Sequence, residues 1–205
     1  MTPEILSYDL PDFSIFNSEA PLDVLVWQPD SRYLVLGQSN QADTSLFTEK
    51  VMADGVPVYK RPSGGETVIL SPNMLVIAVS FKELRLQNPA VYFKKINDTI
   101  ISSLSECGFT GLSQKGISDI SRGPKKVLGS SIYRKPGRVF YHAVLNMAED
   151  PSVISTYIRH PQKEPDYRKG RTHEDFVTSL TGNLQSIPLE KLKAILKSRL
   201  LLISF

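Results

Sequence analysis

Arg61-Pro62-Ser63-Gly64-Gly65 lies between two short apolar stretches, residues 56–59 and 67–70. The two adjacent glycines lack a Cβ atom, so their backbone can adopt positive φ and a ligand can approach it closely. Lys60 and Arg61 place two cations beside this loop, and Ser63 adds a hydroxyl. Backbone N–H groups that converge beside a basic side chain are typical of an anion site, often for a phosphate. The same residues also suit a β-turn that joins two strands of a hairpin, so this stretch alone leaves both interpretations open.

The composition is that of an ordinary globular domain. The chain has 205 residues, of which 41% are hydrophobic and 22% are charged, and a chain of this length forms one domain with its own core. The formal net charge of +3 gives no strong field for nucleic acid or for a membrane surface. We therefore expect one domain over residues 1–205 and no nucleic-acid or membrane partner.

The cysteine content and the lengths of the apolar runs indicate in which cellular compartment the protein works. Cys107 is the only cysteine, which excludes an internal disulfide and a cysteine-based metal site. Residues 1–4 lack the basic and apolar regions of a signal peptide. The longest apolar run, residues 74–81, is far shorter than the ~20 residues that span a bilayer. We expect a soluble, cytoplasmic protein.

Short β-like runs and helical patterns follow one another along the chain. They predict strands at residues 24–27, 33–37, 56–59, 67–70, 74–81, 117–120, 125–133 and 139–145. Apolar spacing and capping residues predict helices at residues 44–53, 92–107, 152–159, 172–180 and 188–200. Asp43 or Thr44 is the expected N-cap of the first helix, and Thr172 that of the fourth. Cys107 falls on the apolar stripe of the second helix, so we expect a packed and unreactive thiol.

A second group of polar residues lies in the C-terminal half. Lys125 and Lys126 are adjacent on a predicted strand, so their side chains face opposite sides and one of them can face a site. Gly129-Ser130-Ser131 follows and again allows close backbone approach beside hydroxyls. Asp119 precedes the lysines. His142 lies within an apolar strand, where a histidine is as often a satisfied core residue as a site residue.

The order of these motifs resembles the catalytic domain of the lipoate–protein ligases, which are related to octanoyltransferases and biotin protein ligases. Arg-x-Ser-Gly-Gly at residues 61–65 and the lysine of Lys126-Val-Leu-Gly-Ser are similar to that family's two main motifs. Residues 163–173 also resemble a segment of some ligase-like proteins. The resemblance covers residues 24–180. It implies an α+β fold in which a mixed, largely antiparallel sheet is flanked by helices.

The resemblance also implies a reaction in two steps. A lipoate carboxylate attacks the α-phosphate of ATP, with Mg2+ held by the phosphates, and gives lipoyl-adenylate and pyrophosphate. The lipoyl group then passes to a lysine of a lipoyl domain or of a glycine-cleavage H protein. The expected small molecules are therefore ATP, Mg2+ and lipoate, and the expected partner is an acceptor protein.

The candidate site residues take their roles from this resemblance. Lys126 is the expected catalytic residue, with its ammonium on the carboxylate and α-phosphate oxygens, where negative charge builds up. The lipoate and phosphate end is expected to be held by Arg61, Ser63, Gly64 and Gly65. Gly129 and Ser130 are expected against the acyl chain or the adenylate, Asp119 on the adenylate or magnesium, and His142 in the site. Val76, Ile77, Val79 and Leu128 line either the core or a groove for the acyl tail.

Structural interpretations of the same residues stay open. Lys126 also fits a solvated lysine at the edge of a sheet. The charged residues near the end of the resemblance form either an ion-pair network or a cover for the nucleotide or the acceptor: Asp166, Arg168, Arg171 and His173. Trp27 is expected in the core.

The chain departs from the family pattern at three places. Glu66 stands where the loop usually carries a third glycine, and Ser71-Pro72 stands where many ligases have His-Asp. We expect no accessory C-terminal domain within residues 1–205, so a separate accessory subunit is one possibility. The alternatives to a ligase are an ATP-independent octanoyl or lipoyl transferase between carrier proteins, and a degenerate member that only binds a cofactor or carrier. Residues 108–126 contain no cysteine, which argues against a covalent cysteine transferase.

Overall fold

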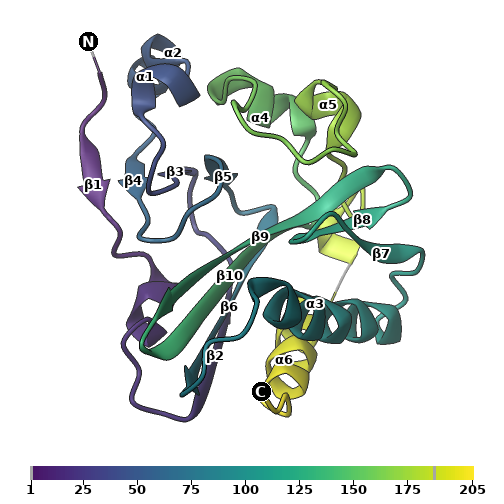
Figure 1. Cartoon of the computed structure of the whole chain (residues 1–205). Coiled ribbons are helices and arrows are strands. Elements are labelled where there is room, and N and C mark those ends of the chain that lie inside the picture. The colour runs from purple at the N-terminus through teal and green to yellow at the C-terminus, as the bar shows by residue number, and fades with distance from the viewer. Residues whose placement is uncertain (1, 187) are drawn as a thin grey trace.

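A computed structural model describes residues 2–186 and 188–205. Two β-sheets form the centre of the fold (Figure 1). The larger sheet has six strands in the order β2-β6-β10-β9-β8-β7, and every neighbouring pair is antiparallel. Its strands are β2 (Leu22–Trp27), β6 (Met74–Glu83), β10 (Gly137–Asn146), β9 (Lys125–Lys135), β8 (Asp119–Arg122) and β7 (Leu112–Lys115).

The smaller sheet has four strands in the order β1-β4-β3-β5. These are β1 (Ile5–Ser7), β4 (Val58–Lys60), β3 (Tyr33–Leu36) and β5 (Val68–Leu70). β4 is parallel to both β1 and β3, whereas β5 is antiparallel to β3. The prediction of a mixed, largely antiparallel α+β fold is confirmed, and the strands divide into two sheets with the parallel pairs confined to the smaller one.

The loop at residues 61–67 is not a hairpin turn. It joins β4 to β5, but β3 lies between these two strands in the sheet. The hairpin interpretation of this stretch is therefore wrong. The loop instead crosses the end of β3, where the Gln38 N–H donates to the Ser63 carbonyl at 3.0 Å. A crossing loop leaves its glycines free for a role other than reversing the chain.

Helices α3 (Pro89–Glu106) and α6 (Leu189–Leu200) cover one face of the larger sheet (Figure 1). The Asn88 side chain caps α3 by accepting from the Ala90 N–H, and Gly108 ends the helix at φ 87°. Its apolar stripe is buried, and each buried Ile or Leu of such a stripe contributes about 1.5–3 kcal/mol. Cys107 packs beside this core half-buried, as expected of a structural thiol.

The strand β6 separates the core from the other side of the sheet. Ile77 and Val79 face α3 and α6 and belong to the main hydrophobic core. Val76 points the opposite way and packs with the buried Trp27, Val35 and Leu70 between the two sheets. Successive side chains of a strand point to opposite faces, and this strand is buried on both.

The shorter helices differ from the sequence-based expectation. Two short helices, α1 (Ala42–Ser45) and α2 (Thr48–Ala53), replace the single helix predicted at residues 44–53. The buried Leu46 between them is extended and bridges to Ile158. The cap residue of α1 is Gln41, so the expected caps Asp43 and Thr44 are wrong. The other short elements are η1 (Pro11–Ile15), α4 (Pro151–Tyr157), α5 (His173–Phe176) and η2 (Leu184–Ser186).

The expected helix over residues 172–180 is only α5. Thr172 caps it as expected, since its hydroxyl accepts from the Asp175 N–H. Val177 is already extended and pairs with Lys126 in an isolated parallel bridge. Pairing with the edge of β9 therefore ends this helix early. None of the helices in the described part of the chain is both long and apolar enough to cross a membrane.

Candidate active site between the two sheets

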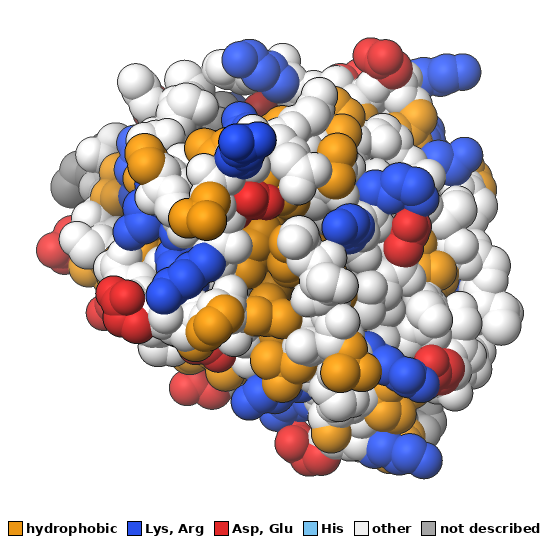
Figure 2. All heavy atoms as spheres, turned by 60° about the horizontal axis from the view of Figure 1, so that its bottom comes forward, with side chains coloured by type: hydrophobic (Ala, Val, Ile, Leu, Met, Phe, Trp, Pro, Cys, Tyr) orange, Lys and Arg blue, Asp and Glu red, His pale blue; other side chains and the backbone are white. Residues whose placement is uncertain are grey.

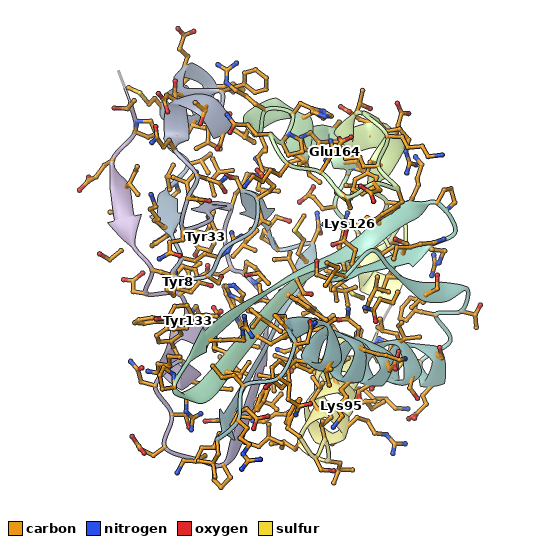
Figure 3. All side chains as sticks on the ribbon, viewed as in Figure 1. Tyr8, Tyr33, Lys95, Lys126, Tyr133 and Glu164 are labelled. Atoms are coloured by element: carbon orange, nitrogen blue, oxygen red, sulfur yellow. The ribbon has the colours of Figure 1, made fainter. Side chains whose placement is uncertain are left out.

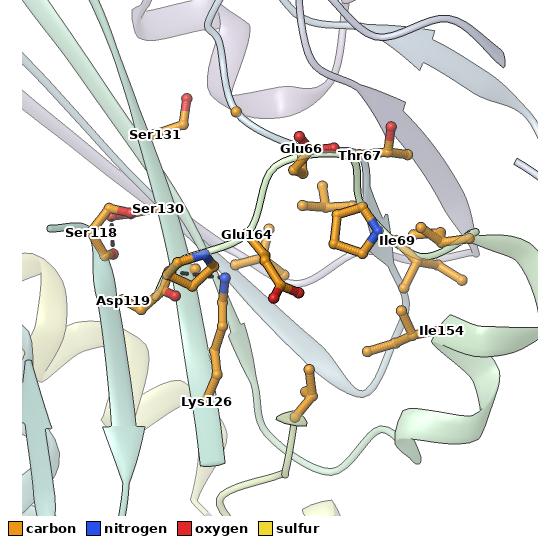
Figure 4. Close-up of a pocket in the computed structure, with 18 of the residues that line it drawn as sticks. Glu66, Thr67, Ile69, Ser118, Asp119, Lys126, Ser130, Ser131, Ile154 and Glu164 are labelled. Carbon is orange, nitrogen blue, oxygen red and sulfur yellow. Dashed lines mark hydrogen bonds and ion pairs between the residues drawn. The ribbon is translucent and has the colours of Figure 1, made fainter. Parts of the chain in front are cut away.

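A cavity of about 800 Å³ lies between the larger and the smaller sheet (Figure 4). One part of its wall is apolar and includes Val35, Ile69, Leu70, Met74, Val76, Leu128, Ala143, Val144 and Ile154. Another part is polar and includes Lys126, Asp119, Ser130, Ser131 and His142. Of the four residues expected in the core or a tail groove, Val76 and Leu128 line the cavity, whereas Ile77 and Val79 lie in the core.

Arg61 holds the shape of the loop at residues 61–67, which we call the glycine loop. Its side chain is buried, and its guanidinium donates to the carbonyls of Val35, Gly64 and Glu66 at 3.1, 2.8 and 2.8 Å. Its Nε also donates to Ser63 Oγ at 3.1 Å. Burial lowers the pKa of Arg61 to about 10, so the side chain stays charged at neutral pH. Most of its donors are thus used by the loop itself, although Arg61 borders the cavity.

The other residues of the loop divide between the cavity and the interior. Gly65 lines the cavity with φ 89°, a conformation that favours glycine. Ser63 is fully buried, and neither it nor Gly64 is among the residues that line the cavity. The Gly64 carbonyl faces the opposite wall and accepts from Ser131 Oγ at 3.0 Å. The loop is therefore tied to β9 across the mouth of the cavity.

Lys126 and Asp119 form an ion pair on the wall of the larger sheet. Lys126 Nζ lies 2.9 Å from Asp119 Oδ1, and the Tyr167 hydroxyl donates to Asp119 Oδ2 at 2.8 Å. The Asp119 side chain is buried, whereas that of Lys126 is 28% exposed. Burial, followed by the Asp119 charge, raises the pKa of Tyr167, so this phenol remains a donor. The lysine thus keeps an accessible ammonium while a fixed carboxylate holds it.

Gly129 makes room for that ammonium. A Cβ atom at Gly129 would lie 2.7 Å from both Cε and Nζ of Lys126. Lys126 therefore folds back over its own strand, and a side chain at position 129 would force its ammonium to move. Lys125, its neighbour, points elsewhere and donates from Nζ to the Glu174 carbonyl at 2.9 Å. Ser130 Oγ donates to the Ser118 carbonyl at 2.6 Å, which ties β9 to the turn before β8.

His142 lies deep in the cavity wall on β10. Its Nε2 is 2.6 Å from Ser63 Oγ, and its Nδ1 is 3.3 Å from Asp12 Oδ2. Burial lowers the pKa of His142, with the Asp12 carboxylate acting in the opposite direction. Tyr8 contacts the same carboxylate and also lines the cavity. Tyr8 and Asp12 were missed by sequence reasoning, because residues 1–20 show no period that would mark them.

Residues 159–172, which we call the cover segment, close one side of the cavity (Figures 3 and 4). Glu164 lies at its centre and points into the cavity on the side of Lys126. Its carboxylate accepts from the Gly170 N–H at 2.7 Å and lies 3.1 Å from His160 Nε2 and 3.5 Å from Arg168 Nε. The Gly170 N–H, ahead of the other contacts, lowers the pKa of Glu164. The carboxylate is therefore ionised and anchors the cover segment.

The expected ion-pair network of this segment is only partly present. Arg168 pairs with Glu164, a residue that the sequence did not single out. Arg171 instead donates to backbone carbonyls, including those of Tyr167 and Pro124 at 2.8 and 3.1 Å. His173 Nε2 lies 3.2 Å from the Arg159 carbonyl. The segment also touches the glycine loop, since the Lys163 N–H donates to Glu66 Oε1 at 3.3 Å.

Lys and Arg side chains are interspersed with Asp and Glu on the face drawn in Figure 2, and hydrophobic side chains gather in a hollow near its middle. Among residues 2–186 and 188–205, no three His, Cys, Asp or Glu side chains come together as a metal site would require. Both oxygens of Asp119, the residue considered for magnesium, already have partners within the protein.

Comparisons with known proteins agree with this architecture. A crystal structure of a lipoate-protein ligase A bound with ATP matches all of this chain and 87% of that chain, with a TM-score of 0.78 and 17% identity. A Thermoplasma acidophilum protein with bound lipoic acid matches 95% of this chain and 79% of that chain, with a TM-score of 0.74 and 18% identity. At identities this low, the structural similarity shows that the fold is shared.

Sequence comparison identifies the family. The model of the lipoyl protein ligase A/B catalytic domain matches residues 14–201, so the chain belongs to that family. A protein of Aeropyrum pernix, provisionally named as a lipoate-protein ligase A, is 28% identical over 164 residues, which cover 70% of this chain. The match covers 56% of that relative, so the chain spans about half of its length.

Proposed function

We propose that this chain is a lipoate–protein ligase that forms lipoyl-adenylate from lipoate and ATP and passes the lipoyl group to a lysine of a lipoyl domain. The single observation that carries this proposal is the position of the Lys126 ammonium. It is held by Asp119 at 2.9 Å, on the wall of a cavity that also has an extended apolar part. Acyl-adenylate chemistry needs a cation beside a groove for the acyl tail. The lipoic acid and the ATP bound to the two structural relatives support this assignment.

In the first proposed step, a lipoate carboxylate oxygen attacks the α-phosphorus of ATP and pyrophosphate leaves. Lys126 stabilises the negative charge that builds up on the α-phosphate oxygens. A compact ammonium suits this task, because it acts as a point charge and does not need a planar partner. Gly65, Gly129 and Ser130 border the same space and would pack against the acyl-adenylate.

In the second proposed step, the uncharged amine of an acceptor lysine attacks the lipoyl carbonyl, and AMP leaves with the bonding electron pair while Lys126 stabilises the charge that builds up on its phosphate. The product is an amide, and the proton lost by the amine goes to solvent or phosphate. The acceptor would approach from the side of the cover segment, where Glu164 and the exposed Lys163 lie. An archaeal relative described as a bipartite lipoate protein ligase with its E2 lipoyl domain supports this type of acceptor.

The same relative supports a second polypeptide in the complete system. That ligase is bipartite, and it shares the fold of this chain with a TM-score of 0.76 at 15% identity. We therefore propose that an accessory subunit assists the activation step. A glycine-cleavage H protein is a further proposed acceptor, and the cytoplasmic location stays a prediction.

Magnesium would enter the site with the nucleotide. The described residues offer no three-ligand cluster, and Asp119 is engaged by Lys126 and Tyr167. The phosphates of ATP are thus the proposed magnesium ligands, and the ion would supply additional charge neutralisation there. The chain's own part is to bind, orient and shield the acyl-adenylate.

A cysteine-based transfer between carrier proteins has no support in the cavity. Cys107 packs against the core that α3 forms with the larger sheet, and it is not among the residues that line the cavity. A transferase of this type needs its nucleophile beside the acyl group.

Mass spectrometry of a purified lipoyl domain tests the proposal. The chain is incubated with the domain, lipoate and magnesium ATP, and pyrophosphate release is followed in parallel. We expect the mass of one lipoyl group on the domain and none on a domain whose acceptor lysine is replaced by arginine. Transfer only from synthetic lipoyl-adenylate would assign activation to a second polypeptide. No transfer from either donor would contradict the proposal.

A further inference from the structure

Asp12, a buried carboxylate in the N-terminal segment, contacts the cavity-lining residue His142. Asp12 of η1 is fully buried, and a buried carboxylate is costly unless its oxygens are hydrogen-bonded. The Tyr8 hydroxyl lies 2.8 and 2.9 Å from its two oxygens, and His142 Nδ1 lies 3.3 Å from Oδ2. Neither the proposed reaction nor the family motifs use this residue.

The contact with Asp12 favours one of the two neutral tautomers of His142. An ionised carboxylate only accepts hydrogen bonds, so the proton of the neutral imidazole lies on Nδ1. Nε2 is then an acceptor, and the hydroxyl 2.6 Å away, that of Ser63, donates to it. Ser63 Oγ in turn accepts from Arg61 Nε at 3.1 Å. Every donor in this chain of contacts thus meets an acceptor.

The chain of contacts ends in the loop that borders the cavity. Arg61 binds the carbonyls of Gly64 and Glu66, which flank Gly65. An order of Asp, His and Ser also occurs in hydrolases, where the serine attacks a substrate. Here Ser63 is fully buried and is not among the cavity-lining residues. Its hydroxyl therefore serves as an anchor rather than as a nucleophile.

We propose that Asp12 is a positioning residue, which fixes the tautomer of His142 so that Nε2 anchors Ser63 and holds residues 61–66 in their binding shape. The inference rests on the proposed function for the identity of the ligand, lipoate. The ordering of the loop itself requires no ligand. Tyr8 supports the same carboxylate from the other side.

The Asp12→Asn variant is the principal test, because it keeps the shape and replaces the acceptor by an amide. We expect nitrogen NMR of ligand-free, 15N-histidine-labelled protein to show His142 changing from Nδ1–H to Nε2–H. Amide hydrogen exchange at residues 64–66 should become faster. The KM for lipoate should rise about tenfold, the effect of losing one buried hydrogen bond, with a smaller change in kcat because Lys126 lies on another wall.

Asp9→Asn is the matched control, since Asp9 lies three residues away in the same segment and is exposed. It should change neither the tautomer nor the exchange rates. Ser63→Ala provides a second route if Asp12→Asn does not fold: it should raise the lipoate KM to a similar extent, and Asp12→Asn should add little to it.

An unchanged His142 tautomer in Asp12→Asn, or an unchanged lipoate KM in Ser63→Ala, would overturn the inference. Failure of the proposed function is distinguishable, because the NMR and exchange measurements use protein without ligand. A protein that ignores lipoate but shows the tautomer change would retain the positioning role and lose the ligase assignment.

Discussion

The carbonyl oxygen of Gly65 occupies the place where Gly37 would carry a side chain. A Cβ atom at Gly37 would lie 1.9 Å from that oxygen and 2.8 Å from Asn40 Oδ1. Gly37 directly follows β3, which the glycine loop crosses. The loop between β4 and β5 can therefore pack against the end of β3 only because Gly37 has no Cβ atom.

Gly37→Ala should therefore displace the loop. The obstacle is backbone rather than a flexible side chain, so we expect a loss of about 1–3 kcal/mol in the free energy of unfolding, as for other overpacked sites. Lipoate affinity should fall in the same variant. Chemical denaturation and ligand titration measure the two effects. Gly182→Ala is the control, because a Cβ there meets nothing within 4 Å. Equal stability of the two variants would show that the loop does not depend on this contact.

Gly129→Ala should act on the reaction rather than on the fold. The new Cβ would lie too close only to the end of the Lys126 side chain, at 2.7 Å, and this end can move, whereas Asp119 Oδ1 at 3.8 Å is an ordinary contact. We expect stability within about 0.5 kcal/mol of the native protein and a fall in kcat of at least about tenfold. The double variant with Lys126→Ala should be no slower than Lys126→Ala alone. Additive losses in that double variant would mean that Gly129 acts through some other contact.

Acid should destabilise the protein through His142. Burial lowers the pKa of this histidine in the folded state, while an unfolded histidine titrates near ~6.5. As pH falls below about 6.5, the unfolded chain gains a proton that the folded chain resists, so this stability is present above that pH and lost below it. The pKa of His173 is also lowered by burial.

Urea denaturation at pH 7.5 and 5.5 compares the native protein with His142→Asn, in which His173 is unchanged. We expect the native protein to lose about 1 kcal/mol more than the variant over this interval, below the limit of about 1.4 kcal/mol per pH unit for one group. Equal losses would mean that His142 is not the group that resists protonation.

Tyr167→Phe should loosen the Asp119 carboxylate that holds Lys126, the proposed catalytic residue. The variant keeps the ring against Phe176 and loses the 2.8 Å hydrogen bond to Asp119 Oδ2. A hydrogen bond to a charged group contributes about 1.5–3 kcal/mol, so we expect kcat to fall about tenfold. Steady-state kinetics measures this change, and an unchanged kcat would show that Asp119 is fixed without Tyr167.

Sequence reasoning singled out those parts of the candidate site that depend on local residue types. The glycine loop forms one short motif, and Lys126 with Gly129 forms a second. Each motif can be recognised because its residues lie within a few positions of one another. Asp12 could not be recognised, since its partner His142 is 130 positions away and no periodicity marks the segment. The hairpin interpretation of residues 61–65 was wrong for the same reason. The strand that separates β4 from β5 precedes both of them in the sequence, and only the sheet order reveals it.

The predicted helix ends are wrong where tertiary contacts override the local preference of the sequence. Leu46 interrupts the expected helix at residues 44–53, because its burial and its bridge to Ile158 require an extended backbone. Val177 ends α5 through pairing with Lys126. α3, by contrast, carries its own cap, a regular apolar stripe and a terminal glycine, and it forms within three residues of its expected start.

Single-turnover transfer from synthetic lipoyl-adenylate to a lipoyl domain tests the central claim most directly, because it does not depend on a second polypeptide. The native chain is compared with Lys126→Ala and with Lys125→Ala, whose side chain leaves the same strand toward Glu174. We predict that Lys126→Ala slows transfer at least about 100-fold, whereas Lys125→Ala stays within about twofold of the native rate. Equal rates for the native chain and Lys126→Ala would contradict the account.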